Sequence, residues 1–185
     1  YHALLLFSVM GMLLMVAAAD LILLFISLEL MSIALYVLVG INRGEWTSVE
    51  GAFKYLVLGA FASGVLLYGI AFVYGAVGST HLSHVSEWLN GGHALTASPL
   101  LATGLALMLV GFCFKIAAAP FHMWSPDVYE GAPVPVTALM STGVKVAAFA
   151  ALGRVLFSGF LVGAVEWAGP LAVVSGLTIL VGNVA

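Results

Sequence analysis

Long apolar stretches that contain very few charged residues limit the folds open to this chain. They cover residues 3–19, 21–41, 49–75, 100–119 and 136–157, and a further stretch covers 169–185. An α-helix needs roughly 20 apolar residues to cross a bilayer. The stretches also lack the alternation of apolar and polar residues that is typical of transmembrane β-barrel strands. We therefore predict an all-α, polytopic transmembrane helix bundle with about six spans, the last of them incomplete.

The composition agrees with a membrane protein. Hydrophobic residues make up 63% of the chain and charged residues 7%, whereas soluble domains carry roughly 25% charged residues. No linker separates the stretches, so residues 1–185 are predicted to form a single transmembrane domain. We expect this domain to be a fragment of a longer chain, because an apolar stretch begins almost at Tyr1 and another continues to Ala185.

Short polar segments mark the predicted connections between the spans. Asp20 is expected at a turn between two antiparallel helices. Residues 42–48 are predicted to form a polar loop, in which Ser48 caps the following helix. Residues 78–99 are predicted to be a second, longer polar loop.

A lysine close to a proline indicates a helix that is broken inside the membrane. Lys115 precedes Pro120 by five residues within an apolar stretch. Proline removes a backbone donor and disfavours helical geometry at Ala119. We predict that residues 120–129 continue the helix after a break, and that 131–135 form a rigid turn. Such breaks are tolerated in a membrane only against protein or a wet cavity.

The charged residues inside the apolar stretches are the main functional signal. Three of the five Lys and Arg residues lie there, Lys54, Lys115 and Lys145, and Glu29 adds a carboxylate. Charged groups at such positions are costly, and by default they mark ion pathways that face the bundle interior. A desolvated lysine can release its proton, whereas arginine stays charged. The pattern therefore predicts proton transfer through these four residues.

Glu29 and Lys54 are predicted to form a pair. They flank the same short loop, and helical rise places them about 18 Å and about 9 Å from it. A long lysine side chain that points inward narrows the gap. Two alternatives stay open: Lys54 reaches the headgroups instead, or Glu29 is protonated and hydrogen-bonded.

Other ionisable residues give weaker signals. His122 follows the predicted break and either relays a proton or is packed into the core. Asp127 and Glu130 are expected in a solvated turn. One pair of histidines in a loop, His81 and His84, is weak support for metal binding, so no metal site is predicted.

The sequence also gives little sign of a cofactor. Cys113 is the single cysteine, which leaves no Cys-rich iron–sulfur or zinc motif. No glycine-rich nucleotide-binding loop follows a strand pattern. We therefore predict no cofactor in this chain.

Three stretches, residues 28–39, 50–69 and 114–138, resemble the antiporter-like membrane subunits of bacterial NADH–quinone oxidoreductase, respiratory complex I. The motif Val-Tyr-Glu-Gly-Ala-Pro at 128–133 is more similar to the subunit N branch of this family than to the related subunits L and M or to Mrp-type antiporters. The resemblance covers nearly the whole chain. It implies the first of two inverted five-helix repeats, followed by the start of the next helix. The second repeat, with its own lysine-bearing broken helix, lies outside this sequence.

The resemblance implies a role for each buried charge. Glu29 matches the buried glutamate of the family, and Lys54 matches its partner lysine. Lys115 matches the lysine at the broken helix, the central proton carrier. Lys145 matches the lysine that links two half-channels.

The resemblance further implies a proton-translocating, non-redox subunit of the enzyme, multi-pass in the bacterial inner membrane. It couples quinone reduction elsewhere in the complex to proton transfer here. NADH, FMN, iron–sulfur clusters and quinone are expected in other subunits. The expected partners are other membrane-arm subunits, above all the sister antiporter-like subunits, and the lipid bilayer, with no nucleic acid.

Two alternatives remain at the level of the sequence. One is a cation–proton antiporter subunit of the Mrp type, which is driven by an ion gradient; sodium transport without NADH distinguishes it. The other is a purely structural membrane subunit whose lysines hold helices together. In that case, replacing a lysine by methionine affects assembly rather than coupling.

Overall fold

The chain folds into an all-helical bundle, as the apolar stretches predict. The structure, a computed structural model, describes residues 1–184. The α-helices in this part are α1 (His2–Ala17), α2 (Leu21–Val39), α3 (Trp46–Val77), α4 (Leu82–Asn90), α5 (Pro99–Ile116), α6 (Ser125–Gly131), α7 (Val134–Leu139), α8 (Lys145–Arg154) and α9 (Ala164–Val184). Five helical segments of the described residues are long and apolar enough to cross a membrane. The predicted polytopic transmembrane bundle is confirmed.

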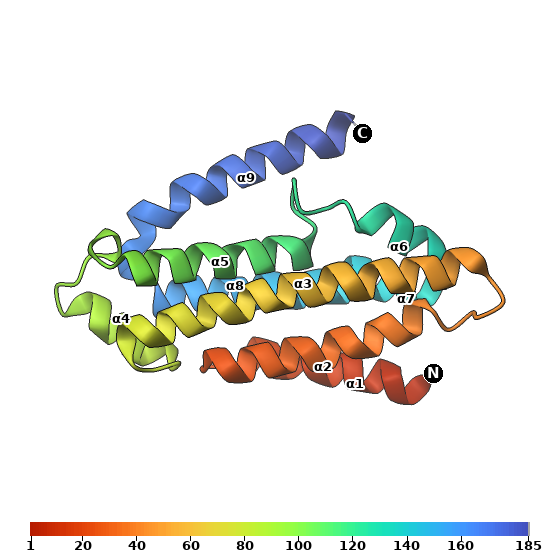
Figure 1. The fold of residues 1–185 in the computed structure, drawn as a ribbon, viewed down its shortest axis with the longest axis horizontal. Coiled ribbons are helices and arrows are strands. Elements are labelled where there is room, and N and C mark those ends of the chain that lie inside the picture. The colour runs from red at the N-terminus through yellow and green to blue at the C-terminus, as the bar shows by residue number, and fades with distance from the viewer. Residues whose placement is uncertain (185) are drawn as a thin grey trace.

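Five helices close into a ring around the core. α1 packs on α2, α2 on α3, α3 on α5 and α5 on α8, and α8 packs back against α1. α3 runs along most of the molecule, with the α1–α2 pair on one side and α5 on the other (Figure 1). Gly69 and Gly104 allow a close crossing of α3 and α5, because a Cβ on Gly104 would lie 2.9 Å from the Gly69 carbonyl oxygen. Small residues at such crossings are typical of membrane helices.

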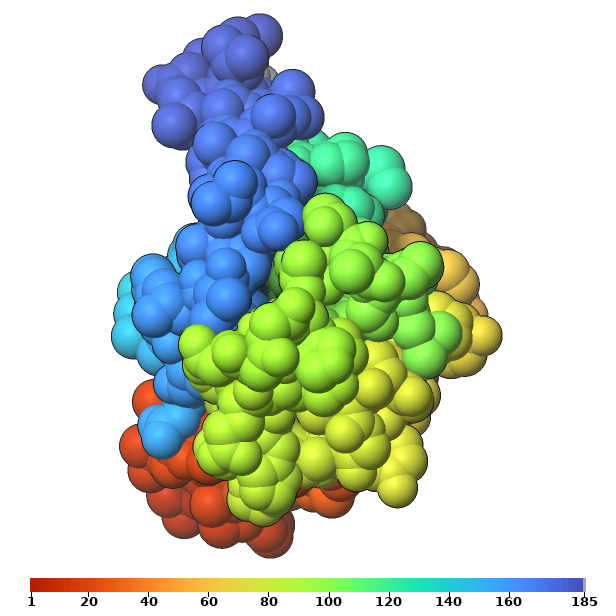
Figure 2. Space-filling model, turned by 90° about the vertical axis from the view of Figure 1, so that its left-hand side faces the viewer, coloured from red at the N-terminus to blue at the C-terminus, as the bar shows by residue number. Residues whose placement is uncertain are grey.

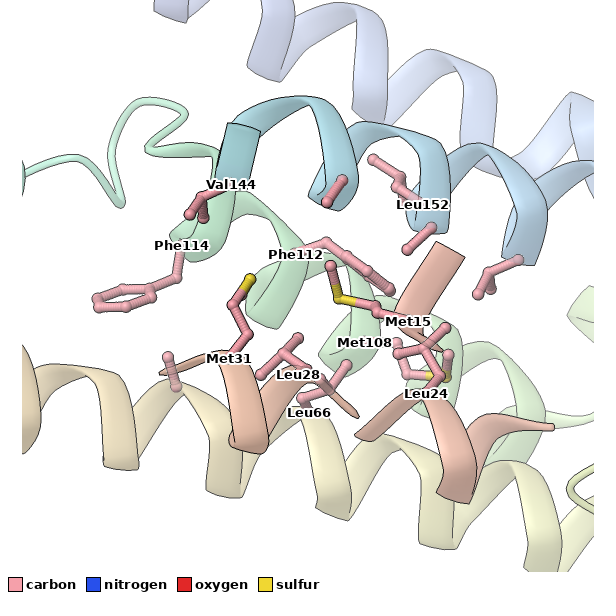
Figure 3. Packing of buried hydrophobic residues seen from close by; sticks show 14 of the residues in the cluster. Met15, Leu24, Leu28, Met31, Leu66, Met108, Phe112, Phe114, Val144 and Leu152 are labelled. Atoms are coloured by element: carbon pink, nitrogen blue, oxygen red, sulfur yellow. The ribbon is translucent and has the colours of Figure 1, made fainter. Parts of the chain in front are cut away.

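The core lies inside this ring. Met15, Leu28, Leu66, Phe112 and Leu152 meet there from five different helices (Figure 3). The outer surface is also apolar, with exposed residues such as Leu13 and Phe61. Lipid is as apolar as leucine, so close packing rather than transfer out of water holds such helices together.

The start of α3 differs from the prediction. The helix begins at Trp46 with Glu45 as its N-cap, and Ser48 lies inside it rather than at its cap. The Ser48 hydroxyl instead donates to the Val39 carbonyl oxygen at 2.6 Å. The last carbonyls of a helix have no partner within it, so Ser48 satisfies the end of α2.

The predicted polar loop at 78–99 contains a helix that the prediction missed. α4 buries Leu82, Val85 and Leu89 at helical spacing. A 3₁₀ turn at Leu95–Ala97 leads into α5. Polar residues between these apolar positions obscured a short amphipathic helix.

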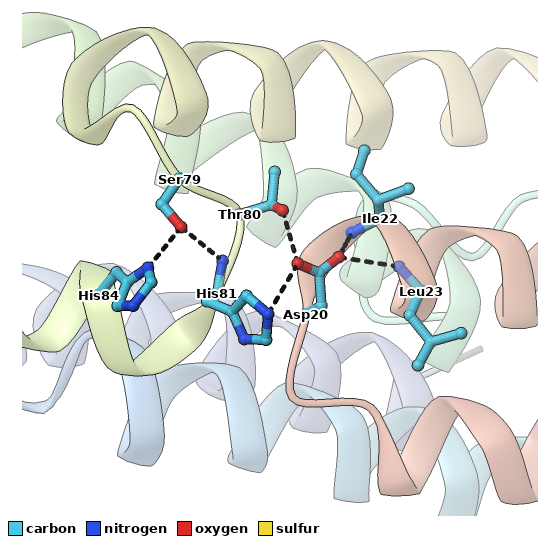
Figure 4. A network of polar contacts seen from close by, with 7 residues as sticks. All are labelled: Asp20, Ile22, Leu23, Ser79, Thr80, His81 and His84. Atoms are coloured by element: carbon cyan, nitrogen blue, oxygen red, sulfur yellow. Dashed lines mark hydrogen bonds and ion pairs between the residues drawn. The ribbon is translucent and has the colours of Figure 1, made fainter.

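The turn predicted at Asp20 is confirmed, and it is tied to the α3–α4 connection (Figure 4). Asp20 accepts hydrogen bonds from the backbone N–H groups of Ile22 and Leu23, and from the Thr80 hydroxyl at 2.6 Å. The backbone N–H of Leu21 also donates a hydrogen bond to the Thr80 carbonyl oxygen at 2.9 Å. Partial burial works against ionisation, but these hydrogen bonds outweigh it and lower the pKa of Asp20 below its ordinary value.

The fifth span is continuous from Val134 to Gly159. It contains two π-helical segments, Met140–Val144 and Val155–Gly159, of which the first ends directly before Lys145. The rigid turn predicted at 131–135 is shorter, because α6 continues to Gly131 and α7 begins at Val134.

The last span starts earlier than the predicted residue 169. α9 begins at Ala164, includes Pro170 and buries none of its residues. It lies outside the ring of five helices in both views (Figures 1 and 2), and its Thr178 hydroxyl oxygen accepts a hydrogen bond from the Ala119 N–H at 3.0 Å.

Candidate functional site

The predicted helix break is present, but it lies before the proline. α5 ends at Ile116, and Ala117 adopts a left-handed conformation with φ of 55°. An irregular segment, residues 117–124, then leads to α6. The prediction that the helix reaches Ala119 is wrong, because the left-handed residue stops it one turn earlier.

Two carbonyl groups next to this break are bonded by side chains from elsewhere in the chain. The Phe114 carbonyl oxygen accepts from the indole N–H of Trp124 at 3.0 Å. The Ile116 carbonyl oxygen accepts from Nζ of Lys145 at 2.7 Å. Unpaired carbonyls are costly away from water, so these side chains stabilise a broken helix inside the bundle.

Lys115 lies at the centre of the site. It is 2% exposed, and its Nζ donates to the Ser32 hydroxyl oxygen at 2.7 Å. Nζ lies 5.8 Å from the ring centre of Tyr36 and 5.9 Å from those of Tyr55 and Phe114. Within residues 1–184 no carboxylate comes close enough to Lys115 to form an ion pair. The prediction that Lys115 is deep in the bundle is therefore confirmed, and its direct partners are a hydroxyl group and aromatic rings.

Glu29 faces the same region from α2. It is half-buried and accepts a short hydrogen bond from the hydroxyl of Ser63 on α3. Ser32 follows Glu29 by three residues, about one helical turn. Ser32 in turn bonds Lys115, so Glu29 and the partner of Lys115 lie one turn apart on α2.

Lys54 does not pair with Glu29, so that prediction is wrong. Its Nζ forms ion pairs with Glu50 at 2.7 Å and with Asp127 of α6 at 2.6 Å. Lys54 and Ser63 are nine residues apart on α3, or about two and a half turns, which places them on opposite faces. Because Ser63 faces Glu29, Lys54 points away from it.

The Lys54 side chain lines a small polar cleft instead. The cleft has a volume of about 80 Å³ and is lined by Thr47, Glu50, Gly51, Lys54, Asp127 and Glu130. The Lys54 side chain is 39% exposed. Asp127 was expected in a solvated turn; it is exposed, but it lies in the first turn of α6 and is ion-paired.

Lys145 approaches the break from the other side. It is half-buried at the start of α8, directly after a π-helical segment. Besides its bond to the Ile116 carbonyl, its Nζ lies 5.9 Å from the ring centre of Tyr129. Lys115 lies in the last turn of α5 and Lys145 bonds the carbonyl of the next residue, so both lysines lie at the same helix break.

The histidines have different surroundings. His122 is half-buried in the 117–124 segment, and its Nδ1 has no hydrogen-bond partner within the described residues. Its predicted role as a relay stays a prediction. His84 bonds Ser79 at 2.8 Å, and His81 Nε2 lies 3.9 Å from Asp20. Residues 1–184 contain no group of three or more His, Cys, Asp or Glu that could hold a metal ion.

Sequence reasoning missed the neutral residues of the site. Ser32, Ser63, Tyr36, Tyr55 and Trp124 surround the buried charges. Ser32 carried a signal, since it is a polar residue one turn from Glu29, although it bonds Lys115 rather than the glutamate. Ser63 lies on another helix, and nothing in the sequence tied it to Glu29. The aromatic residues carry no such signal, because tyrosine and tryptophan in membrane helices are also interface anchors.

The ring of apolar helices and the buried lysine at a helix break define a polytopic membrane protein of the antiporter-like class. The family profile described as "NADH:quinone oxidoreductase/Mrp antiporter, TM" matches residues 18–185. The chain therefore belongs to the NADH:quinone oxidoreductase/Mrp antiporter transmembrane family.

Individual relatives agree with this assignment. NADH-quinone oxidoreductase subunit N of Gemmatimonas aurantiaca is 50% identical over 98% of this chain and 35% of its own length. A chain of respiratory complex I from Thermus thermophilus superposes with a TM-score of 0.71 at 44% identity, over 82% of this chain and 33% of that one. A chain of the Mrp complex from Dietzia superposes with a TM-score of 0.74 at 27% identity, over 84% of this chain and 29% of that one. The sequence spans about a third of the length of the curated relatives it matches.

Proposed function

We propose that this chain is part of a proton-translocating membrane-arm subunit of NADH–quinone oxidoreductase, of the subunit N type, in a bacterial inner membrane. The curated relatives named subunit N support this proposal. The observation that carries it is the meeting of Lys115 and Lys145 at one helix break inside the bundle. A buried lysine can hold or release a proton, so two of them at one break suit a relay.

The proposed path uses the chain's own protonatable groups. Lys115 holds the central proton, and Glu29 lies one helical turn from Ser32, the residue that bonds Lys115. Lys145 receives the proton on the far side of the break. Lys54, with Glu50 and Asp127, forms a polar mouth rather than a partner for Glu29. His122, half-buried in the 117–124 segment, is an additional relay candidate.

The rest of the enzyme supplies the driving reaction in this proposal. NADH, FMN, iron–sulfur clusters and quinone belong to other subunits, and the single cysteine of this sequence agrees with that division. The partners are other membrane-arm subunits, including the sister antiporter-like subunits. Residues 1–185 act as a single transmembrane domain of the longer subunit.

Replacing Lys115 by methionine tests the proposal. The full-length subunit carries Lys115→Met within the assembled enzyme, and NADH-driven proton uptake into inverted membrane vesicles is followed with a pH-sensitive dye. We expect pumping per NADH oxidised to fall severalfold, because methionine fills the space but carries no proton. Arg43→Gln, in the exposed loop before α3, is the control and keeps normal pumping. Full pumping with Lys115→Met would refute the proposal.

The second candidate is a cation–proton antiporter subunit, which the likeness to the Mrp complex favours. Its lower identity, 27% against 44% for the complex I chain, places it second. Sodium-dependent proton movement in vesicles without NADH would support it. If Lys115→Met prevents assembly on blue-native gels, the structural alternative gains instead.

A further inference from the structure

We propose that Tyr36, Tyr55 and Phe114 form an aromatic cage that holds Lys115 in its ammonium form. The inference rests on the proposed function, since it makes these three residues positioning residues for the proton on Lys115. It explains why three aromatic rings surround the ammonium group of Lys115, which the buried charged residues alone do not explain.

The first support is the position of the ammonium group over three ring faces. Nζ of Lys115 lies over the rings of Tyr36, Tyr55 and Phe114 at 5.8, 5.9 and 5.9 Å from their centres. The face of an aromatic ring is negative, and it attracts a cation within about 6 Å, more strongly where water is excluded. Tyr36, Tyr55 and Phe114 are 6%, 1% and 7% exposed, so the contact lies away from solvent.

The second support is that the conventional partners of an ammonium group are few at this position. Ser32 accepts one of its three protons, and no ion pair reaches it within residues 1–184. An uncompensated charge in such surroundings is costly. The aromatic faces supply the compensation that a carboxylate would supply elsewhere.

The third support is that the cage is built rigidly. Tyr55 stacks on Trp124, with the ring centres 4.7 Å apart and the ring planes at 13°. Tyr36 and Tyr55 pack edge to face, with the ring centres 4.7 Å apart and the planes at 88°. Trp124 also stacks on Phe114 at 5.4 Å and bonds the Phe114 carbonyl. Gly59 leaves the space that the Tyr36 hydroxyl occupies, because a Cβ there would collide with it.

Other titratable groups near the site come from each neighbouring element. They are Glu29 on α2, Lys145 on α8, His122 in the 117–124 segment and Tyr129 on α6. Of these, Glu29 is engaged by Ser63, and Lys145 by the Ile116 carbonyl. Beyond the single hydrogen bond to Ser32, the favourable contacts of the Lys115 ammonium group are therefore the three rings of the cage.

The pH dependence of proton pumping tests the cage. The variants Tyr55→Leu and Tyr55→Phe are placed in the full-length subunit of the assembled enzyme, and pumping per NADH oxidised is measured from pH 6 to 9. Without the ring, the ammonium form is lost more easily. We expect the alkaline midpoint of pumping in Tyr55→Leu to move down by about one pH unit, a tenfold change in proton affinity. Tyr55→Phe keeps the ring, so it restores the midpoint.

Two further variants separate the possible failures. Tyr68→Leu, at an exposed position on the same helix, is the matched control and keeps the normal midpoint. Full pumping with Lys115→Met would overturn the proposed function itself. Loss of pumping with Lys115→Met, together with a normal midpoint in Tyr55→Leu, would overturn the cage alone. An equal shift in Tyr55→Phe would overturn it too, because the hydroxyl rather than the ring would then matter.

The cage can still be tested if the Tyr55→Leu enzyme fails to assemble. If blue-native gels show no assembled Tyr55→Leu enzyme, Phe114→Leu is measured in its place, since it removes a ring but keeps the carbonyl that Trp124 bonds. The same downward shift supports the cage. A normal midpoint, or loss of assembly here as well, assigns the rings a structural role only and refutes the proposal.

Discussion

The partners of the buried charges differ from those that charge pairing alone suggests. Glu29 bonds the Ser63 hydroxyl, and Lys115 bonds the Ser32 hydroxyl. Hydroxyl groups can donate to a carboxylate and accept from an ammonium. They therefore hold both charged groups in place without joining them in a direct ion pair.

The hydrogen bond to Glu29 predicts a measurable loss in Ser63→Ala. Removing the hydroxyl leaves a half-buried carboxylate with one partner fewer, so we expect a destabilisation of about 1 kcal/mol, the usual size for such bonds between membrane helices. Unfolding of the full-length subunit in mixed detergent micelles measures it. Lys54→Met is the comparison and should leave the Glu29 environment unchanged. The losses in the two single variants should add in the double variant, because Lys54 pairs with Glu50 and Asp127; marked non-additivity would support the Glu29–Lys54 pair instead.

At the scale of elements, the turns between spans also tie helices to one another. The turn before α2 and the turn before α4 exchange two backbone hydrogen bonds, Leu21 N to Thr80 O and Leu82 N to Ala19 O, at 2.9 and 3.0 Å. Asp20 adds its carboxylate to this junction (Figure 4). The end of the bundle formed by these two turns is therefore joined across α1, α2, α3 and α4.

The lowered pKa of Asp20 predicts that the stability of this junction depends on pH. A carboxyl group whose pKa is lower when folded stabilises the fold above its unfolded value, here 3.8, and this contribution is lost as the pH falls through the folded value. We expect Asp20→Asn to melt below the unmodified protein at pH 7, with the gap closing on acidification to about pH 3. Thermal unfolding in detergent at several pH values measures it.

His81 requires its own control, because its Nε2 lies 3.9 Å from Asp20. His81→Gln removes the imidazole and keeps the hydrogen bonds to Asp20 from Thr80 and the backbone. The acid-dependent gap should survive in the His81→Gln background. A gap that is constant from pH 7 to 3 would show that the ionised carboxylate does not stabilise the junction.

At the scale of the whole molecule, the close crossing of α3 and α5 holds the ring of five helices together. It brings the α5 break, with Lys115, against Tyr55 of α3 and Ser32 of α2. The site is therefore assembled from segments far apart in the sequence. Its geometry depends on how closely the helix backbones approach.

The crossing predicts that a single methyl group destabilises the bundle. In Gly104→Ala the new Cβ lies 2.9 Å from the Gly69 carbonyl oxygen, so the helices must separate, and we expect a loss of about 1–3 kcal/mol. Gly64→Ala on α3 is the matched control, since nothing lies within 4 Å of its Cβ. It should be neutral or stabilising by about 0.5–1 kcal/mol, because alanine favours a helix. Equal effects of the two substitutions in detergent unfolding would contradict the role of the crossing.

The sequence by itself determined the all-helical class, the approximate ends of the spans, the turn at Asp20 and the burial of Lys115. These follow from local physics: the length of apolar stretches, the cost of a charge in the membrane and the effect of proline near a helix end. The family resemblance added the antiporter-like identity through short motifs such as residues 114–138.

Only the tertiary structure decided which groups meet. The pairing of Lys54 with Asp127, of Glu29 with Ser63 and of Lys145 with the Ile116 carbonyl depends on how each helix is rotated about its axis. In a soluble protein a polar face reveals that rotation. Here the lipid-facing and core-facing sides are both apolar, so the sequence carries no such marker, and packing contacts between backbones settle the rotation.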